Sequence, residues 1–346
     1  MTSDASSAEP QRSDVLGPGE LPRPEQQAAR LKARNVGRDA QGPTDIPPRG
    51  WWQVLRRVTT EATSDRLPIM AAGCAFFALL AIFPAMSVLI SLYGLVLDPT
   101  ALEQQLEGAR AVLPAAAYDL VAQRLHALAV KGTTTLSWGV ALGVVLALWS
   151  ASAGTKALIV ALNTAYEEKE KRPFLRYQAT ALLFTLCGVL GVAVALSVIV
   201  GLPAVLQLGW LGPMAQTTAS AVSYLLLVAF IVLGLALLYR FAPSRREAQW
   251  RWVTPGSAVA TLLWLLASFL FSYYVANFAS YDAMYGSLGA VVVTLFWFYI
   301  SAFVVMLGAE LNAELELQTK RDTTSGHERP MGQRGAYVAD HVALPD

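Results

Sequence analysis

Residues 177–239 read YQATALLFTLCGVLGVAVALSVIVGLPAVLQLGWLGPMAQTTASAVSYLLLVAFIVLGLALLY, and these 63 positions contain no Asp, Glu, Lys or Arg. The whole chain of 346 residues is 55% apolar and 15% charged, with a mean hydropathy of +0.44. Soluble domains carry about 25% charged residues. Only a chain surrounded by lipid can present so much uncharged surface, so the sequence predicts an all-α, polytopic membrane protein.

Turn residues such as Gly201, Pro203 and Gly212 divide this stretch into two apolar segments. A bilayer core about 30 Å thick is crossed by roughly 20 helical residues. Applying that length outward along the chain predicts six transmembrane helices. Their expected ranges are Ile69–Leu97, Leu136–Leu158, Ala179–Leu202, Ala215–Tyr239, Thr254–Phe278 and Ser287–Ala309.

The loops between these segments differ in positive charge. One set of flanks carries thirteen Lys and Arg residues, and the opposite set carries three, all between residues 98 and 135. The thirteen are Arg56, Arg57, Arg66, Lys169, Lys171, Arg172, Arg176, Arg240, Arg245, Arg246, Arg251, Lys320 and Arg321. Positive charge favours the cytoplasmic side, so we expect both termini in the cytoplasm.

Two further segments have helical periodicity without being long enough to span. Apolar residues recur at helical spacing in the long first outer loop, residues 98–135, and predict amphipathic helices on the outer surface. Trp51, Trp52, Val54 and Val58 beside two arginines predict an interfacial helix before the first span. Residues 1–50 and 318–346 are polar and are expected to be disordered cytoplasmic tails around a membrane domain at 51–317.

Lys156 and Glu310 are the ionisable residues that come closest to the predicted hydrocarbon region. Both lie near the cytoplasmic boundary, on the second and sixth spans. One interpretation is a charge pair between these spans beneath a polar site that includes Asn163. The simpler interpretation is that Lys156 extends to the headgroups and Glu310 is the first wetted residue after its span.

Near the outer surface, Tyr274, Asn277, Tyr281, Asp282 and Tyr285 form a polar and aromatic series. An aromatic belt at the membrane interface is the simpler explanation, and an outward-facing vestibule is the alternative. Pro84 interrupts the first span and predicts a kinked or broken helix, as occurs at some transporter binding sites.

Three segments resemble the YihY/BrkB family of bacterial inner-membrane proteins, historically labelled ribonuclease BN. They are AAGCAFFALLAIFPAM (71–86), GTKALIVALNTAYEEKEKRPFLR (154–176) and YVANFASYDAMYGSLGAVVVTLFWFYISAFVVMLGAELNAE (274–314). The resemblance implies six helices in the bacterial plasma membrane. The family-typical residues that it transfers to this chain are Pro84, Asn163, Tyr166, Arg172, Tyr274, Tyr281, Tyr285, Gly286, Gly289, Gly308, Glu310 and Asn312.

The sequence leaves two functions open, which are a transporter or permeation pathway for a small solute or lipid-like molecule, and an envelope scaffold that moves nothing. A ribonuclease is not expected, because only His126 lies outside the predicted tails and no cluster of His and Asp ligands is present. We therefore expect no catalytic residues, no metal and no cofactor. The expected partners are the lipid bilayer and an unidentified solute, with further copies of the chain as an alternative and no nucleic acid.

The charge asymmetry predicts a definite topology. Reporter fusions at Glu168 and Arg246 are expected to report the cytoplasm, and fusions at Ala115 and Trp210 the opposite side, because Lys and Arg stay on the cytoplasmic side during insertion. Enzymatic activity of the fused reporter measures this. A cytoplasmic signal from a fusion at Leu211 would show that the chain does not cross the membrane between the third and fourth segments.

Overall fold

The structure is a computed structural model that describes residues 36–96, 138–196, 198, 213–278 and 289–343. Within these ranges the regular elements are helical, apart from one isolated antiparallel bridge between Ala248 and Thr324. The long helices are α3 (Leu67–Val96), α6 (Trp138–Ala165), α7 (Phe174–Leu196), α9 (Pro213–Phe241), α10 (Trp250–Phe278) and α12 (Gly289–Leu317). The shorter elements are η1 (Pro43–Asp45), α2 (Pro48–Ser64) and α13 (Tyr337–Asp340).

The long helices are apolar around their whole circumference, as lipid contact requires. Five of them, α6, α7, α9, α10 and α12, are long and apolar enough to cross a membrane, and the bent pair of α2 and α3 brings the number to six within the described residues. Large apolar side chains stay exposed on them, including Leu225 (70%) and Phe269 (69%). The prediction of an all-α, polytopic membrane protein is confirmed.

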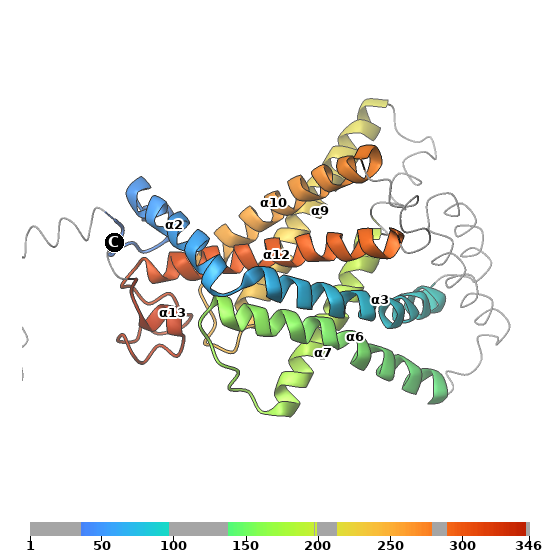
Figure 1. The fold of residues 1–346 in the computed structure, drawn as a ribbon, viewed down its shortest axis with the longest axis horizontal. Coiled ribbons are helices and arrows are strands. Elements are labelled where there is room, and N and C mark those ends of the chain that lie inside the picture. Colours follow the sequence, from blue (N-terminus) through green and yellow to red (C-terminus); the bar gives the residue numbers. More distant parts are fainter. Residues whose placement is uncertain (1–35, 97–137, 197, 199–212, 279–288, 344–346) are drawn as a thin grey trace, which may run out of the picture.

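The helices pack around α12, which contacts α2, α3, α6 and α10 (Figure 1). Helix α9 packs beside α10, and α7 packs beside α6. The buried residues gather where α6 and α9 end and α10 begins, at the same end of the molecule as α2 and α13. We call this the polar end of the bundle, because most buried polar side chains of the described residues also lie there.

A close contact between backbones joins α10 to α12. A Cβ atom on Gly256 would overlap the carbonyl oxygen of Gly308, and one on Gly308 would overlap the hydroxyl of Tyr239. The Asn312 side chain reinforces the contact, because its Oδ1 accepts a hydrogen bond from the Gly256 amide (2.8 Å) and its Nδ2 donates one to the Val253 carbonyl (3.1 Å). The absence of side chains on both glycines lets the two backbones touch.

The chain bends by 63° between α2 and α3, at Asp65 and Arg66. Arg66 takes a left-handed conformation (φ +55°) that turns the chain there. The sequence placed a kink or break at Pro84 instead. Helix α3 continues through Pro84 as one helix, because a membrane helix tolerates one missing backbone donor when its neighbours pack around it.

Helix α2 confirms the predicted amphipathic helix before the first span. Its Val54 and Val58 are buried against Trp252 of α10 and Leu315 of α12, while Trp52 is 71% exposed. The amphipathic helices predicted for residues 98–135 lie outside the described residues. The long helices that the structure describes follow one another in the order of the predicted spans.

The C-terminal segment differs from the expected disordered tail. Helix α12 continues to Leu317, and residues 318–343 fold back against the polar end. The guanidinium of Arg334 is buried and donates to the carbonyl oxygens of Ala339 (2.6 Å), Lys320 (2.9 Å) and Arg321 (3.1 Å). Hydrogen bonds of this kind order a segment that lacks enough apolar residues to do so itself. Residues 36–50 are likewise described, and Gly50 is buried.

The α10–α12 contact can be tested with Gly256→Ala. The new methyl group has no room beside the Gly308 carbonyl, so the helices must separate at a cost of about 1–3 kcal/mol. Thermal unfolding of the detergent-purified protein measures the loss. Gly234→Ala is the matched control, because nothing lies within 4 Å of a Cβ there and alanine favours the helix by up to about 1 kcal/mol. Equal melting temperatures for the two variants would contradict the close contact.

Candidate functional site at the polar end

Asn163 joins three separate segments at the polar end. Its Nδ2 donates to Glu170 Oε2 (3.1 Å) after α6, and its Oδ1 accepts from the Ser244 amide (2.7 Å) between α9 and α10. Arg172 completes the group, with Nε 2.8 Å and Nη2 2.7 Å from the two carboxylate oxygens of Glu170 and Nη2 2.9 Å from the Ala242 carbonyl. The Arg172 side chain holds the pKa of Glu170 at about 2. This group fixes the α6–α7 loop against the α9–α10 loop.

A second group is built on a fully buried ion pair. Both side chains of Arg245 and Glu316 have no solvent exposure, and two hydrogen bonds of 2.7 and 3.2 Å join them. Thr323 of the C-terminal segment donates to Glu316 Oε2 (2.6 Å). The Arg245 guanidinium also lies 4.0 Å from the ring centre of Tyr166, whose buried hydroxyl faces Asn312 without completing a hydrogen bond.

The structure does not form the charge pair proposed between Lys156 and Glu310. The Lys156 ammonium lies 5.3 Å from the ring centre of Trp149, on its own helix. Glu310 is buried, with 3% of its surface exposed, and its Oε2 has no hydrogen-bond partner. The charged groups that act on Glu310 are all carboxylates, those of Asp65, Glu314, Glu61 and Glu167. Lys156 and Glu310 are thus surrounded by different neighbours.

Three of these carboxylates form a cluster that sequence reasoning missed. One carboxylate oxygen from each of Glu61, Asp65 and Glu167 lies within 4.8 Å of the others. Burial, and then the charges of Glu167, Glu61 and Glu314, raises the pKa of Asp65 to about 6. The signal was hidden because Glu167 is about a hundred positions away in the sequence, and only the bend between α2 and α3 brings it to the other two.

The proposed outer vestibule is described only in part. Asn277 is exposed, and its Nδ2 donates to the Tyr273 carbonyl of its own helix (2.8 Å). Tyr274 is also exposed, at 47%. Tyr281, Asp282 and Tyr285 lie outside the described residues, so the vestibule stays a prediction.

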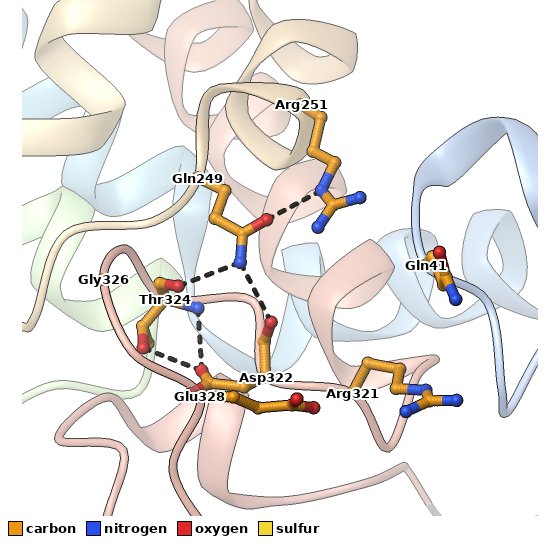
Figure 2. A pocket seen from close by; sticks show the side chains of 8 residues that line it. All are labelled: Gln41, Gln249, Arg251, Arg321, Asp322, Thr324, Gly326 and Glu328. Carbon is orange, nitrogen blue, oxygen red and sulfur yellow. Dashed lines mark hydrogen bonds between the residues drawn. The ribbon is translucent and has the colours of Figure 1, made fainter.

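A polar pocket of about 270 Å³ lies where the C-terminal segment meets the start of α10 (Figure 2). Gln249 Nε2 donates to the carbonyl oxygens of Thr324 (3.0 Å) and Asp322 (3.2 Å), and Arg251 Nε donates to Gln249 Oε1 (2.7 Å). Arg321 and Gln41 lie across the pocket from this network. Two arginines and two carboxylates, Asp322 and Glu328, line it, so its charges balance and it selects neither sign of ligand.

The family described as virulence factor BrkB matches residues 58–332, which include α3 to α12 and most of the polar end. The chain belongs to the virulence factor BrkB family.

Relatives of this BrkB chain cover most of it. A ribonuclease-like protein, YfkH, of Bacillus subtilis is 33% identical over 260 residues, which are 72% of this chain and 90% of the relative. A UPF0761 membrane protein of Tolumonas auensis is 26% identical, covering 72% of this chain and 81% of the relative. Another from Pseudoalteromonas translucida is 25% identical, covering 79% and 88%. No solved structure matches the chain.

The buried ion pair predicts a large asymmetry between two charge deletions. Arg245→Met leaves Glu316 buried without its cation, which is expected to cost about 3–5 kcal/mol of stability. Lys171→Met removes the cation of the pair with Glu168, but 66% of the Lys171 side chain is exposed, so about 1 kcal/mol or less is expected. Thermal unfolding in detergent distinguishes the two.

The double variant Arg245→Met/Glu316→Leu serves as the internal control. It removes both buried charges and is expected to recover much of the loss. A single Arg245 variant as stable as the Lys171 variant would show that the pair contributes nothing.

Proposed function

We propose that the chain is a transporter or permeation pathway for a small solute or lipid-like molecule, in the bacterial plasma membrane, with both termini cytoplasmic. The observation that carries the proposal is Glu310, a buried carboxylate without a hydrogen-bond partner on Oε2, inside the candidate span Val291–Leu317. The bacterial relatives named membrane proteins and the uneven Lys and Arg of the loops support the location.

Glu310 is expected to lower the stability of the folded chain at its position. An unpartnered polar group in a buried site costs about 1–3 kcal/mol, and more when it is charged. Four carboxylates add repulsion to that cost. Ionisable residues that a membrane protein keeps under such conditions mark ion and substrate pathways, because they can gain and lose a proton or a cation.

The position of Glu310 also suits exchange with water. It lies close to the cluster of Glu61, Asp65 and Glu167, of which Glu167 is exposed and the other two are partly exposed. Glu310 is therefore next to carboxylates that water reaches, although its own side chain is buried. Asn312, two residues after Glu310 on α12, uses both its Oδ1 and its Nδ2 in hydrogen bonds to the backbone of α10, so its role is structural.

The alternative function is an envelope scaffold that binds partners without moving a solute. The ordered C-terminal segment favours it, since residues 318–343 present a folded surface at the polar end. Against it, a scaffold has no use for an unpartnered carboxylate inside the bundle.

RNA cleavage, which the name of the Bacillus subtilis relative suggests, is not part of this proposal. The carboxylate cluster has no histidine among its members, and the charges that act on Asp65 are all negative. Nucleic-acid binding requires Lys and Arg contacts to the phosphates, and the three members of the cluster supply none.

Flux through liposomes tests the transport proposal. The purified protein is reconstituted, and the movement of protons, K⁺, Cl⁻, radiolabelled amino acids and sugars, and a fluorescent phospholipid is compared with protein-free liposomes. At least one probe is expected to move faster with the protein, and Glu310→Gln should slow it by about tenfold or more, because this variant loses the ionisable group. Glu328→Gln, an exposed carboxylate of the C-terminal segment, is the matched control.

No acceleration of any probe would overturn the transport proposal in favour of the scaffold. Flux that Glu310→Gln leaves unchanged would separate transport from Glu310 and remove the observation on which the proposal rests.

A further inference from the structure

The carboxylates of Glu61, Asp65 and Glu167 meet where three helices come together. Glu61 lies in the last turn of α2, and Asp65 caps the end of that helix, with its amide 2.8 Å from the Glu61 carbonyl oxygen. A spacing of four residues puts both side chains on one face of α2. Glu167 lies directly after α6, in a left-handed conformation (φ +54°) that ends the helix.

The electrostatics of this place favour a cation. Helices α2 and α6 both end at the cluster, and the carboxyl end of a helix carries a partial negative charge that lysine or arginine normally offsets. Here each helix ends in a carboxylate instead. The charged groups that act on Asp65 are Glu167, Glu61 and Glu314, and no lysine, arginine or histidine is among them.

Glu310 provides an independent observation beside the cluster. Its carboxylate is 97% buried, given its 3% exposure, and Oε2 has no hydrogen-bond partner. Asp65 is the neighbour whose charge acts on it most strongly, followed by Glu314, and Glu61 and Glu167 act on it as well. Of these, Glu314 already has a cation, because Arg57 bonds to it.

We propose that Glu61, Asp65 and Glu167 bind one divalent cation of the hard, oxygen-preferring class, Ca²⁺ or Mg²⁺, beside the buried carboxyl group of Glu310. An ion bound to oxygen at about 2.3–2.6 Å, as Ca²⁺ is, can touch two ligands separated by up to about 4.6–5.2 Å. The three oxygens lie within 4.8 Å of one another, so an ion at their centre is at most about 2.8 Å from each, and small side-chain movements bring all three into the range of Ca²⁺. Water fills the remaining positions, because Glu167 is exposed and leaves the site open to solvent.

The bound ion ties the bend between α2 and α3 to the end of α6. The ion pairs between described residues join other places: Arg57–Glu314 connects α2 to α12, Arg245–Glu316 connects the α9–α10 loop to α12, and the remaining pairs lie within the α6–α7 loop or between α9 and the loop that follows it. This inference does not depend on transport, because an ion can bind at this place whether or not the chain moves a solute.

Cation binding is measured on the full-length protein in detergent. Equilibrium dialysis against radioactive Ca²⁺, with Mg²⁺ as the competitor, is expected to show one ion per chain. Asp65→Asn and Glu167→Gln should each weaken binding by about tenfold or more, because each removes one of three charged ligands. Glu328→Gln, outside the cluster, should bind as the unaltered chain does.

A second readout separates lost binding from lost folding. Ca²⁺ is expected to raise the melting temperature of the unaltered chain and of Glu328→Gln, and to leave that of Asp65→Asn and Glu167→Gln unchanged. Variants that melt cooperatively without Ca²⁺ and no longer respond to it support the site. Binding of neither Ca²⁺ nor Mg²⁺ to the unaltered chain, or equal binding by a cooperatively melting Asp65→Asn/Glu167→Gln double variant, would overturn it.

Discussion

The contact between α10 and α12 fixes the centre of the bundle, because the backbones of two long helices touch there. Gly256 and Gly308 remove the side chains that would keep the helices apart, and Asn312 then satisfies a donor and an acceptor of α10 from α12. In lipid, helices gain little from burying apolar side chains against each other, so close packing and internal hydrogen bonds determine which helices pair. With α10 fixed, α12 can serve as the central helix on which α2, α3 and α6 pack.

The same physics explains why the molecule has two unlike parts. Along the apolar lengths of the helices, side chains such as Leu225 and Phe269 stay exposed to the surroundings that lipid provides. At the polar end, water competes for hydrogen bonds. Buried polar groups there bind each other instead of water, as Asn163 does with Ser244 and Arg245 with Glu316. Buried hydrogen bonds and ion pairs of the described residues are therefore concentrated at the polar end.

Sequence reasoning recovered the fold because its main determinant is local. A run of about 20 apolar residues predicts a span wherever it occurs, so the six segments and the amphipathic α2 were accessible from composition and periodicity. The C-terminal segment was not, because its order depends on Arg334 and Thr323 meeting partners that are distant or individually unremarkable.

The site was recovered less well, and for the same reason. Lys156 and Glu310 were matched by depth alone, but depth does not say which way a side chain points around its helix. Lys156 lies over Trp149, whereas Asp65 is the charged neighbour that acts most strongly on Glu310. Asn163, Tyr166, Arg172 and Asn312 do lie at the polar end, although their partners could be named only from the structure.

The polar end has a consequence for how the protein is made. A ribosome delivers the chain from its amino end, and domains generally begin to fold in that order. Arg245 emerges well before Glu316, and Glu316 before Thr323, so the guanidinium between α9 and α10 stays without its carboxylate until α12 has been synthesised. The spans can enter the membrane one after another, but the polar end closes only when Glu316 and Thr323 leave the exit tunnel. A chain that stops short of them would be inserted and yet unfinished, and membrane quality-control proteases would meet it in that state.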